Sequence, residues 1–316
     1  MALNGAYRVP LSWRLFDAVD GVVARLWPKR MARATPYLFL APAFLLVSIL
    51  VVGLVYIGDY SFRELDFSTY RLAESYSVTN YATIVERPVY RTIIGRSLLA
   101  AVVVTAITIV LAFPYAYVMV RTRSSFLRKF LLIGLFLPFF IGQVVRAYGW
   151  LIVLGQEGLI NSLLGALGIA PVKMIYNYPA VILGLVQYML PFAVLLLAPA
   201  ITAIHEEFEM ASEGLGAGWV RTFRHVVIPM AKPGLIGASV VVFTLTLTDF
   251  AMPEILGGGT TDFIANAIYD GFFEISNPGL GSALAIVLVG LGSALVAIVF
   301  AIVGTGTLGF AAEKTE

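Results

Sequence analysis

Long runs of apolar residues dominate the hydropathy pattern of the chain, and short polar segments separate them. A helix needs about 20 consecutive, mostly apolar residues to cross a bilayer. Six runs reach that length, and none of them alternates with the period of two that a barrel strand requires. The predicted spans are residues 36–58, 93–120, 131–154, 179–204, 234–256 and 281–304. The pattern therefore predicts an all-α membrane protein with six transmembrane helices.

The N-terminal segment is polar and basic, with apolar residues such as Trp13, Phe16 and Val23 at roughly helical spacing. It lacks the continuous apolar stretch of a cleavable signal peptide. We expect a helix that lies flat in the membrane interface, and a packed soluble helix is the alternative. The predicted organisation is a cytoplasmic or interfacial segment (1–35), a membrane domain (36–305) and a cytoplasmic tail (306–316).

Composition agrees with a bilayer environment, because 59% of the residues are hydrophobic, 13% are charged and the mean hydropathy is +0.90. A net charge of +2 is too small to suggest nucleic-acid binding. Lysine and arginine are concentrated in the N-terminal segment, in residues 121–129 and in the loop 205–232. Cytoplasmic loops are enriched in these residues, so both termini and the 205–232 loop are predicted to be cytoplasmic.

The sequence lacks the motifs of several enzyme classes. No Gly-Lys pair followed by Ser or Thr is present, so the chain has no P-loop for ATP. With no cysteine and two histidines, and no second histidine four residues after His205, a metal site is not expected. A Gly-x-Ser-x-Gly nucleophile elbow is also absent. We therefore expect no catalytic residues, no metal and no cofactor bound by this chain.

The loop 205–232 carries the most specific pattern. Phe208, Ala211 and Leu215 share one face of a short helix, and the glycines that follow permit a turn. A second apolar face, built on Trp219 and Phe223, leads to a proline that ends the helix. Such a helix–turn–helix can present a rigid knob to a cytoplasmic partner, and an ordinary polar loop is the alternative.

This loop resembles the coupling loop of ABC importer permeases, whose signature is Glu-Ala-Ala, three residues, Gly, nine residues, a hydrophobic residue, one residue and Leu-Pro. The glutamate is displaced here, because the register places Met210 at its position and Glu209 one residue earlier. The role of any single carboxylate is therefore open, although Glu209 or Glu213 can still meet basic groups of an ATPase. The residues that the resemblance assigns to the coupling loop are Glu209, Met210, Ala211, Ser212, Gly216, Ala217, Ile228 and Pro229.

The resemblance implies a type I ABC importer permease fold in the bacterial inner membrane. It also implies partners: a homologous and distinct second permease, two ATPase subunits that bind ATP and Mg, and a periplasmic binding protein. Two further stretches, Leu137–Trp150 and Phe243–Gly258, resemble the spermidine/putrescine branch of that family. This branch implies a polyamine substrate, with an opine or amino-acid derivative as the alternative.

Ionisable side chains within predicted spans are costly and usually face a bundle interior or an aqueous path. Aromatic residues beside them can contact an ammonium group through their rings, or anchor the helix ends at the interface. The substrate-pathway candidates are Arg146, Tyr148, Trp150, Asp249, Phe250 and Glu254. Pairing of Arg146 with Asp249 to hold two helices together is the structural alternative.

Residues 258–280 contain Asp262, Asp270 and Glu274 and no lysine or arginine. This segment is predicted to face the outside, where its charge favours an arriving cation or a docking partner. A self-contained secondary transporter or channel is the alternative function from another class, followed by a membrane-embedded enzyme.

Overall fold

The computed structural model describes residues 35–303, together with Trp13 and Asp17. The chain separates into two units, residues 1–56 and 57–316. Most of the segment 1–35, where we expect an interfacial helix, and all of the tail 306–316 lie outside the described residues. These two assignments stay predictions.

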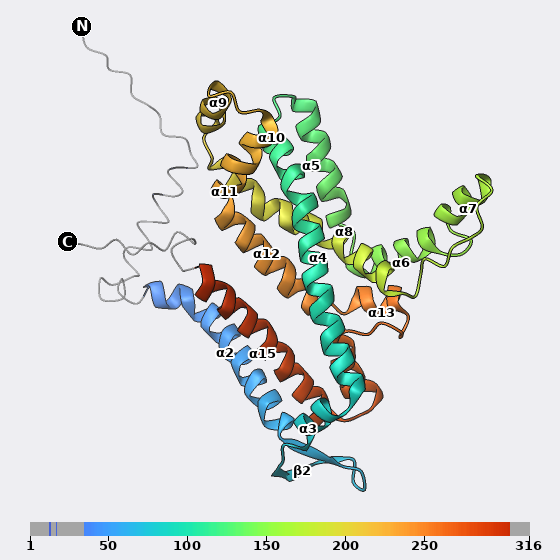
Figure 1. Ribbon diagram of the computed structural model, residues 1–316. Helices are drawn as coiled ribbons and strands as arrows, with labels where there is room; N and C mark the ends of the chain where they lie inside the picture. The colour runs from blue at the N-terminus through green and yellow to red at the C-terminus, as the bar shows by residue number, and fades with distance from the viewer. Residues whose placement is uncertain (1–12, 14–16, 18–34, 304–316) are drawn as a thin grey trace. The chain divides into compact units, whose positions relative to one another are not determined.

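The described residues form helices almost throughout, with one two-stranded hairpin (Figure 1). The first half of the chain contains α2 (Thr35–Ser61), β1 (Arg63–Asp66), β2 (Arg71–Tyr76), α3 (Thr79–Glu86), α4 (Pro88–Arg121), α5 (Ser125–Phe139), α6 (Gln143–Leu154) and α7 (Leu159–Ala166). The second half contains α8 (Tyr178–Thr202), α9 (Glu206–Gly214), α10 (Trp219–Thr222), the π-helix η2 (Phe223–Val227), α11 (Ile228–Met230), α12 (Lys232–Leu247), α13 (Ala251–Gly257), α14 (Ile264–Tyr269), the π-helix η3 (Asp270–Glu274) and α15 (Pro278–Val303).

In the first unit, α2 is apolar along its length, and its side chains from residue 36 to residue 56 are exposed. A helix that is apolar all round suits hydrocarbon and not water. This part of α2 therefore has the surface of a transmembrane helix.

The core of the second unit is built by α4, α8 and α12, which pack against one another (Figure 1). Buried residues such as Val104, Leu185 and Val242 fill the space between them. The helices approach closely because small residues face each other. A Cβ atom on Gly234 of α12 would lie 2.2 Å from the Cβ of Ala200 of α8. Small residues at such contacts are typical of helices packed in membranes.

Within the part of the chain that the structure describes, four helices are continuous and apolar enough to cross a membrane, namely α2, α4, α8 and α15. Two bent pairs raise the number to six if each pair counts as one span. The two helical stretches of residues 125–139 and 143–166 are bent by 99°, and those of residues 219–230 and 232–247 by 71°. The all-α fold class and the number of spans thus agree with the sequence prediction.

The predicted third and fifth spans, 131–154 and 234–256, are wrong as continuous helices. The third breaks after Phe139, where Pro138 in the last turn has no N–H and Gly142 adopts an extended backbone conformation. In the fifth, α12 ends at Leu247 and a separate short helix, α13, follows the break. Each break frees backbone groups that must be satisfied from within the protein.

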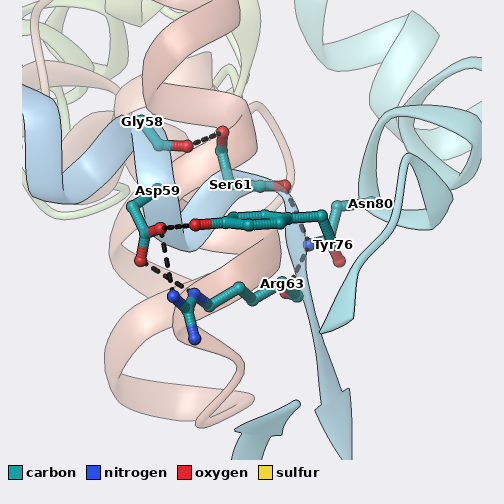
Figure 2. A network of polar contacts seen from close by, with 6 residues as sticks. All are labelled: Gly58, Asp59, Ser61, Arg63, Tyr76 and Asn80. Carbon is teal, nitrogen blue, oxygen red and sulfur yellow. Dashed lines mark hydrogen bonds and ion pairs between the residues drawn. The ribbon is translucent and has the colours of Figure 1, made fainter. Parts of the chain in front are cut away.

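The hairpin between α2 and α3 is held by a network of polar contacts (Figure 2). Asp59 forms an ion pair with Arg63 at 2.8 Å and accepts a hydrogen bond of 2.8 Å from the Tyr76 hydroxyl. The buried Asn80 side chain donates to the carbonyl oxygens of Ser61 and Arg63 at 3.1 and 2.9 Å. The last turn of α2, both strands and the start of α3 are thereby joined.

Candidate functional site

The loop between α8 and α12 has the predicted helix–turn–helix form. The short helix α9 ends in a turn at Gly216, whose φ of +86° lies in the left-handed region that favours glycine. The Ala217 N–H donates to the Ser212 carbonyl oxygen at 3.1 Å and closes the turn. The second helix is interrupted, because α10 passes into the π-helix η2 and then into α11, which contains Ile228 and Pro229.

The side of α9 that faces the rest of the protein is polar. Glu209 accepts hydrogen bonds from the Tyr117 hydroxyl at 2.5 Å and from Arg121 Nε at 2.9 Å, both on α4. Ser212, three residues further along α9, shares a hydrogen bond of 2.9 Å with Thr222 of α10. Positions three residues apart lie on one face of a helix, so these contacts fix the orientation of α9.

Aromatic rings hold the second half of the loop against α4. The Phe223 ring meets Phe113 and Tyr117 edge to face, with centroids 5.3 and 5.2 Å apart. Trp219 stacks on Phe223 at 5.3 Å. Edge-to-face pairs add about 0.5–1.5 kcal/mol beyond burial of area. Both halves of the loop therefore contact the last turns of α4.

The apolar side chains of α9 and of Leu215, the residue after it, are exposed. Phe208, Met210 and Leu215 are 50%, 58% and 91% exposed, and Ala211 is exposed as well. Met210 occupies the register position of the family's glutamate. Phe208 and Leu215, seven residues apart, lie on one side of the helical turn, and Met210 lies on another.

Arg146 lies at the break between α5 and α6 and is 7% exposed. Its guanidinium donates to the carbonyl oxygens of Pro138 and Ile141, the groups that the break frees, and lies over the Tyr188 ring at 5.1 Å from the centroid. Arg146 therefore caps the end of α5.

Asp249 occupies the corresponding place between α12 and α13 and is 6% exposed. Its carboxylate accepts a hydrogen bond of 3.0 Å from the Met252 N–H, at the start of α13, and another from the Gln143 side chain of α6. Gln143 thus connects the two breaks, and no ion pair joins Arg146 to Asp249 in the structure. The pairing of these two residues considered from sequence is not formed.

Of the other pathway candidates, Phe250 lies in the second break directly after Asp249, and Tyr148, Trp150 and Glu254 lie within the neighbouring helices α6 and α13. On α6, Trp150 donates to the Gln187 side-chain oxygen of α8 at 3.3 Å, while Tyr148 is 56% exposed. Phe250 packs on Tyr269 at 5.1 Å, and the exposed Glu254 accepts a hydrogen bond of 2.8 Å from Asn266 of α14. Whether any of these side chains contacts solute stays a prediction.

Carboxylates of the segment after α13 lie close enough to influence one another. Burial, followed by the charges of Glu274, Asp262 and Glu254, raises the pKa of Asp270 to about 6. Burial and the charge of Glu254 also raise the pKa of Asp262, although Arg96 opposes the shift. Together with Glu254 of α13, these carboxylates form an acidic surface.

Sequence reasoning did not identify Tyr117 and Arg121 as residues that support the loop 205–232. Arg121 stood out only as one of several cytoplasmic basic residues. Its contact with Glu209 joins residues 88 positions apart in the chain, which no local spacing can reveal. An arginine and a tyrosine four residues apart at the end of a span were the only signal.

Comparison with known proteins identifies the family. Residues 109–309 match the model of the family described as binding-protein-dependent transport system inner membrane component. The chain is 31% identical over 212 residues to the spermidine/putrescine transport system permease protein PotB of Haemophilus influenzae, covering 66% of this chain and 73% of that protein. It is 32% identical over 254 residues to the inner membrane ABC transporter permease protein YdcU of Escherichia coli, covering 74% and 80%.

Solved structures show the same fold. A chain from the crystal structure of a bacterial alginate ABC transporter, in complex with an alginate pentasaccharide-bound periplasmic protein, superposes with a TM-score of 0.76. The match covers 90% of this chain and 98% of that chain at 19% identity. A chain of the MetNI methionine ABC transporter superposes with a TM-score of 0.52, covering 66% and 91% at 19% identity. The protein is therefore a member of the family of binding-protein-dependent transport system inner membrane components, the permeases of ABC importers.

Proposed function

We propose that this permease moves polyamines through the inner membrane and receives its driving force from separate ATPase subunits at the loop formed by α9, α10, η2 and α11. The coupling role is supported by the difference between the shielded and the exposed side chains of α9. Its inner face is fixed to α4 by polar contacts, whereas Phe208, Met210 and, directly after the helix, Leu215 are exposed to solvent. A rigid knob with an exposed apolar face suits docking into a cleft of a partner.

The proposed assembly contains this permease, a second and distinct permease, two ATPase subunits and a periplasmic binding protein. ATP and Mg bind to the ATPases, and both termini of this chain lie in the cytoplasm. The distribution of lysine and arginine supports this orientation, because it places the knob on the cytoplasmic side. ATP-driven closure of the ATPases then displaces the knob and rocks the helices between inward-open and outward-open states.

Two observations support a polyamine as substrate. The relative from Haemophilus influenzae is named as a spermidine/putrescine transport permease. The acidic surface of Glu254, Asp262, Asp270 and Glu274 attracts a multiply charged cation, since the segment 258–280 contains no lysine or arginine. An opine or amino-acid derivative carries its own carboxylate and is attracted less.

The transport assay uses vesicles that hold the complete assembly and measures ATP-dependent uptake of radiolabelled putrescine and spermidine. Saturable uptake that excess unlabelled polyamine suppresses supports the proposed substrate. Suppression by an opine or a cationic amino acid at lower concentration, with no polyamine uptake, contradicts it.

The docking role of the knob is tested separately with Leu215→Asp, which places a charge on its most exposed apolar side chain. Burial of one leucine contributes about 1.5–3 kcal/mol, so we expect co-purification of the ATPase to weaken by roughly tenfold or more. Leu167→Asp is the matched control, because Leu167 is 76% exposed and lies after α7, outside the knob. Equal ATPase binding by both variants contradicts docking at Leu215.

A further inference from the structure

Three side chains on one face of α4 contact the coupling loop, which is formed by α9, α10, η2 and α11. Phe113, Tyr117 and Arg121 are spaced four residues apart and therefore lie along one side of the helix. Phe113 contacts η2, Tyr117 contacts both η2 and α9, and Arg121 contacts α9. The last turns of α4 thus form the surface on which the loop is mounted (Figure 1).

Glu209 makes the polar contacts between α9 and this surface of α4. One of its carboxylate oxygens accepts from the Tyr117 hydroxyl, and the other lies 2.9 Å from Arg121 Nε and 2.8 Å from Arg121 Nη2. This is a two-pronged contact of a guanidinium with a carboxylate oxygen, and charge-assisted bonds of this kind are stronger than neutral ones.

Arg121 also extends the contact to a third helix. Its Nη2 donates to the carbonyl oxygen of Ile204 at 2.6 Å, just beyond the end of α8. One guanidinium therefore joins the end of α4, the end of α8 and the inner face of α9.

The contact is shielded from solvent. The Arg121 and Glu209 side chains are 15% and 12% exposed, whereas Glu206, Glu207 and Glu213 of the same helix are exposed. A shielded pair is screened little by salt and orients its partners, and removal of one member leaves the other charge uncompensated. Only one of the four glutamates of α9 is therefore committed to the interior of the chain.

We propose that Tyr117 and Arg121 are positioning residues that clamp Glu209, so that a displacement of the coupling loop passes to α4 through this carboxylate. Glu209 is then an internal link and not the carboxylate that meets the ATPase. The one-residue shift of the glutamate relative to the family signature has this structural meaning, because it turns the carboxylate inward and leaves Met210 on the docking face. The proposal rests on the coupling role proposed above.

The first test measures the clamp in the full-length permease alone, by hydrogen exchange of residues 206–214. Glu209→Gln retains the shape of the side chain and removes its charge. We expect at least about a tenfold increase in exchange, the factor that loss of one charge-assisted hydrogen bond produces. Glu213→Gln is the matched control, with the same change on an exposed position of the same helix, and we expect no increase. Unchanged exchange in Glu209→Gln overturns the clamp.

The second test measures coupling in the complete assembly, as the stimulation of ATP hydrolysis by the loaded binding protein. We expect Glu209→Gln to retain ATPase binding and basal hydrolysis and to lose most of the stimulation. Loss of ATPase binding in Glu209→Gln with normal hydrogen exchange would show that Glu209 faces the ATPase and would overturn the proposal. Faster exchange with full stimulation would overturn the transmission to α4.

Two further variants distinguish loss of the Glu209 contacts from a failure of the protein to fold. Tyr117→Phe keeps the ring contacts with Phe223 and removes only the hydroxyl that reaches Glu209, so a smaller change in the same direction is expected. The exchanged pair Arg121→Glu with Glu209→Arg should recover part of the stimulation that either single change removes, and absence of recovery counts against a direct link. If wild type shows stimulation without polyamine uptake, the proposed substrate fails while the result on the clamp stands.

Discussion

Gly216 holds the turn between α9 and α10 in a left-handed backbone conformation, with open space around the position that a Cβ atom would occupy. Gly216→Ala therefore adds backbone strain without a steric clash, and we expect a local cost of about 1 kcal/mol. Faster hydrogen exchange in residues 212–218 and a several-fold lower uptake rate are the expected results.

Gly214 provides the control for this prediction, because it is the last residue of α9, has no positive φ and also has open space beside it. Alanine is favoured over glycine in a helix by about 1 kcal/mol, so Gly214→Ala should leave the loop as stable as wild type or more so. If both alanine variants behave alike, the left-handed turn is not what limits the loop.

At the scale of elements, the contact of α12 with α8 depends on Gly234. A side chain there meets Ala200, since even a Cβ atom would lie 2.2 Å from the Cβ of that residue. We expect Gly234→Val to separate the helices and to lower stability by about 1–3 kcal/mol or more, the usual cost of overpacking. A lower midpoint of thermal unfolding in detergent measures the effect.

The matched control is Gly237→Val, one turn further along α12. No atom lies within 4 Å of the position of its Cβ, so the same substitution meets no neighbour and costs only helix propensity. A similar loss of stability in both variants would mean that propensity, and not the contact with α8, explains the effect of Gly234→Val.

The elements also show how far sequence reasoning reaches. Continuous apolar runs predicted α2, α4, α8 and α15 with boundaries within a few residues, because hydropathy alone requires these helices to be long. Hydropathy did not predict the breaks after Phe139 and Leu247, since a broken helix is as apolar as a continuous one. Pro138, Gly142 and the charges of Arg146 and Asp249 were the available signals of the breaks, and the sequence analysis interpreted only the two charged residues, as pathway candidates.

The candidate site, like the fold, was predicted only in part from the sequence. The short helix, the glycine turn and the proline at the end of the loop follow from local spacing, and the structure contains all three. The side of α9 that faces inward does not follow, because local spacing places Phe208, Ala211 and Leu215 on one face without giving its direction, and the structure leaves that face exposed. The inner face is polar because Arg121 and Tyr117 of α4 lie opposite, and only the tertiary structure brings these residues together.

At the scale of the whole molecule, the acidic surface after α13 makes the attraction of a cation depend on pH. The pKa of Asp270 is raised to about 6, so its carboxyl group is neutral below that pH and charged above it. A polyamine keeps its charge throughout this range, since alkyl amines titrate near pH 10. We therefore expect KM for putrescine uptake to fall roughly two- to fivefold as the external pH rises from about 5 to about 7.

The raised pKa of Asp270 affects folding stability in the opposite direction from transport. The pKa in the folded protein lies above the ordinary value of 3.8, so the folded state resists ionisation, and the contribution of this group to stability declines as pH rises from about 4 to about 6. Ionisation of Asp270 therefore does not raise transport by stabilising the fold. Asp270→Asn should remove the part of the pH dependence that belongs to the acidic surface.

Asp66 supplies the control because it lies in the hairpin, and the Ser68 hydroxyl and N–H and the Thr69 hydroxyl lower its pKa. It is charged throughout the range from pH 5 to pH 7, so Asp66→Asn should leave the slope of KM against pH unchanged. If Asp270→Asn also leaves the slope unchanged, the acidic surface does not guide the substrate, and its carboxylates are then better explained by contact with a binding protein.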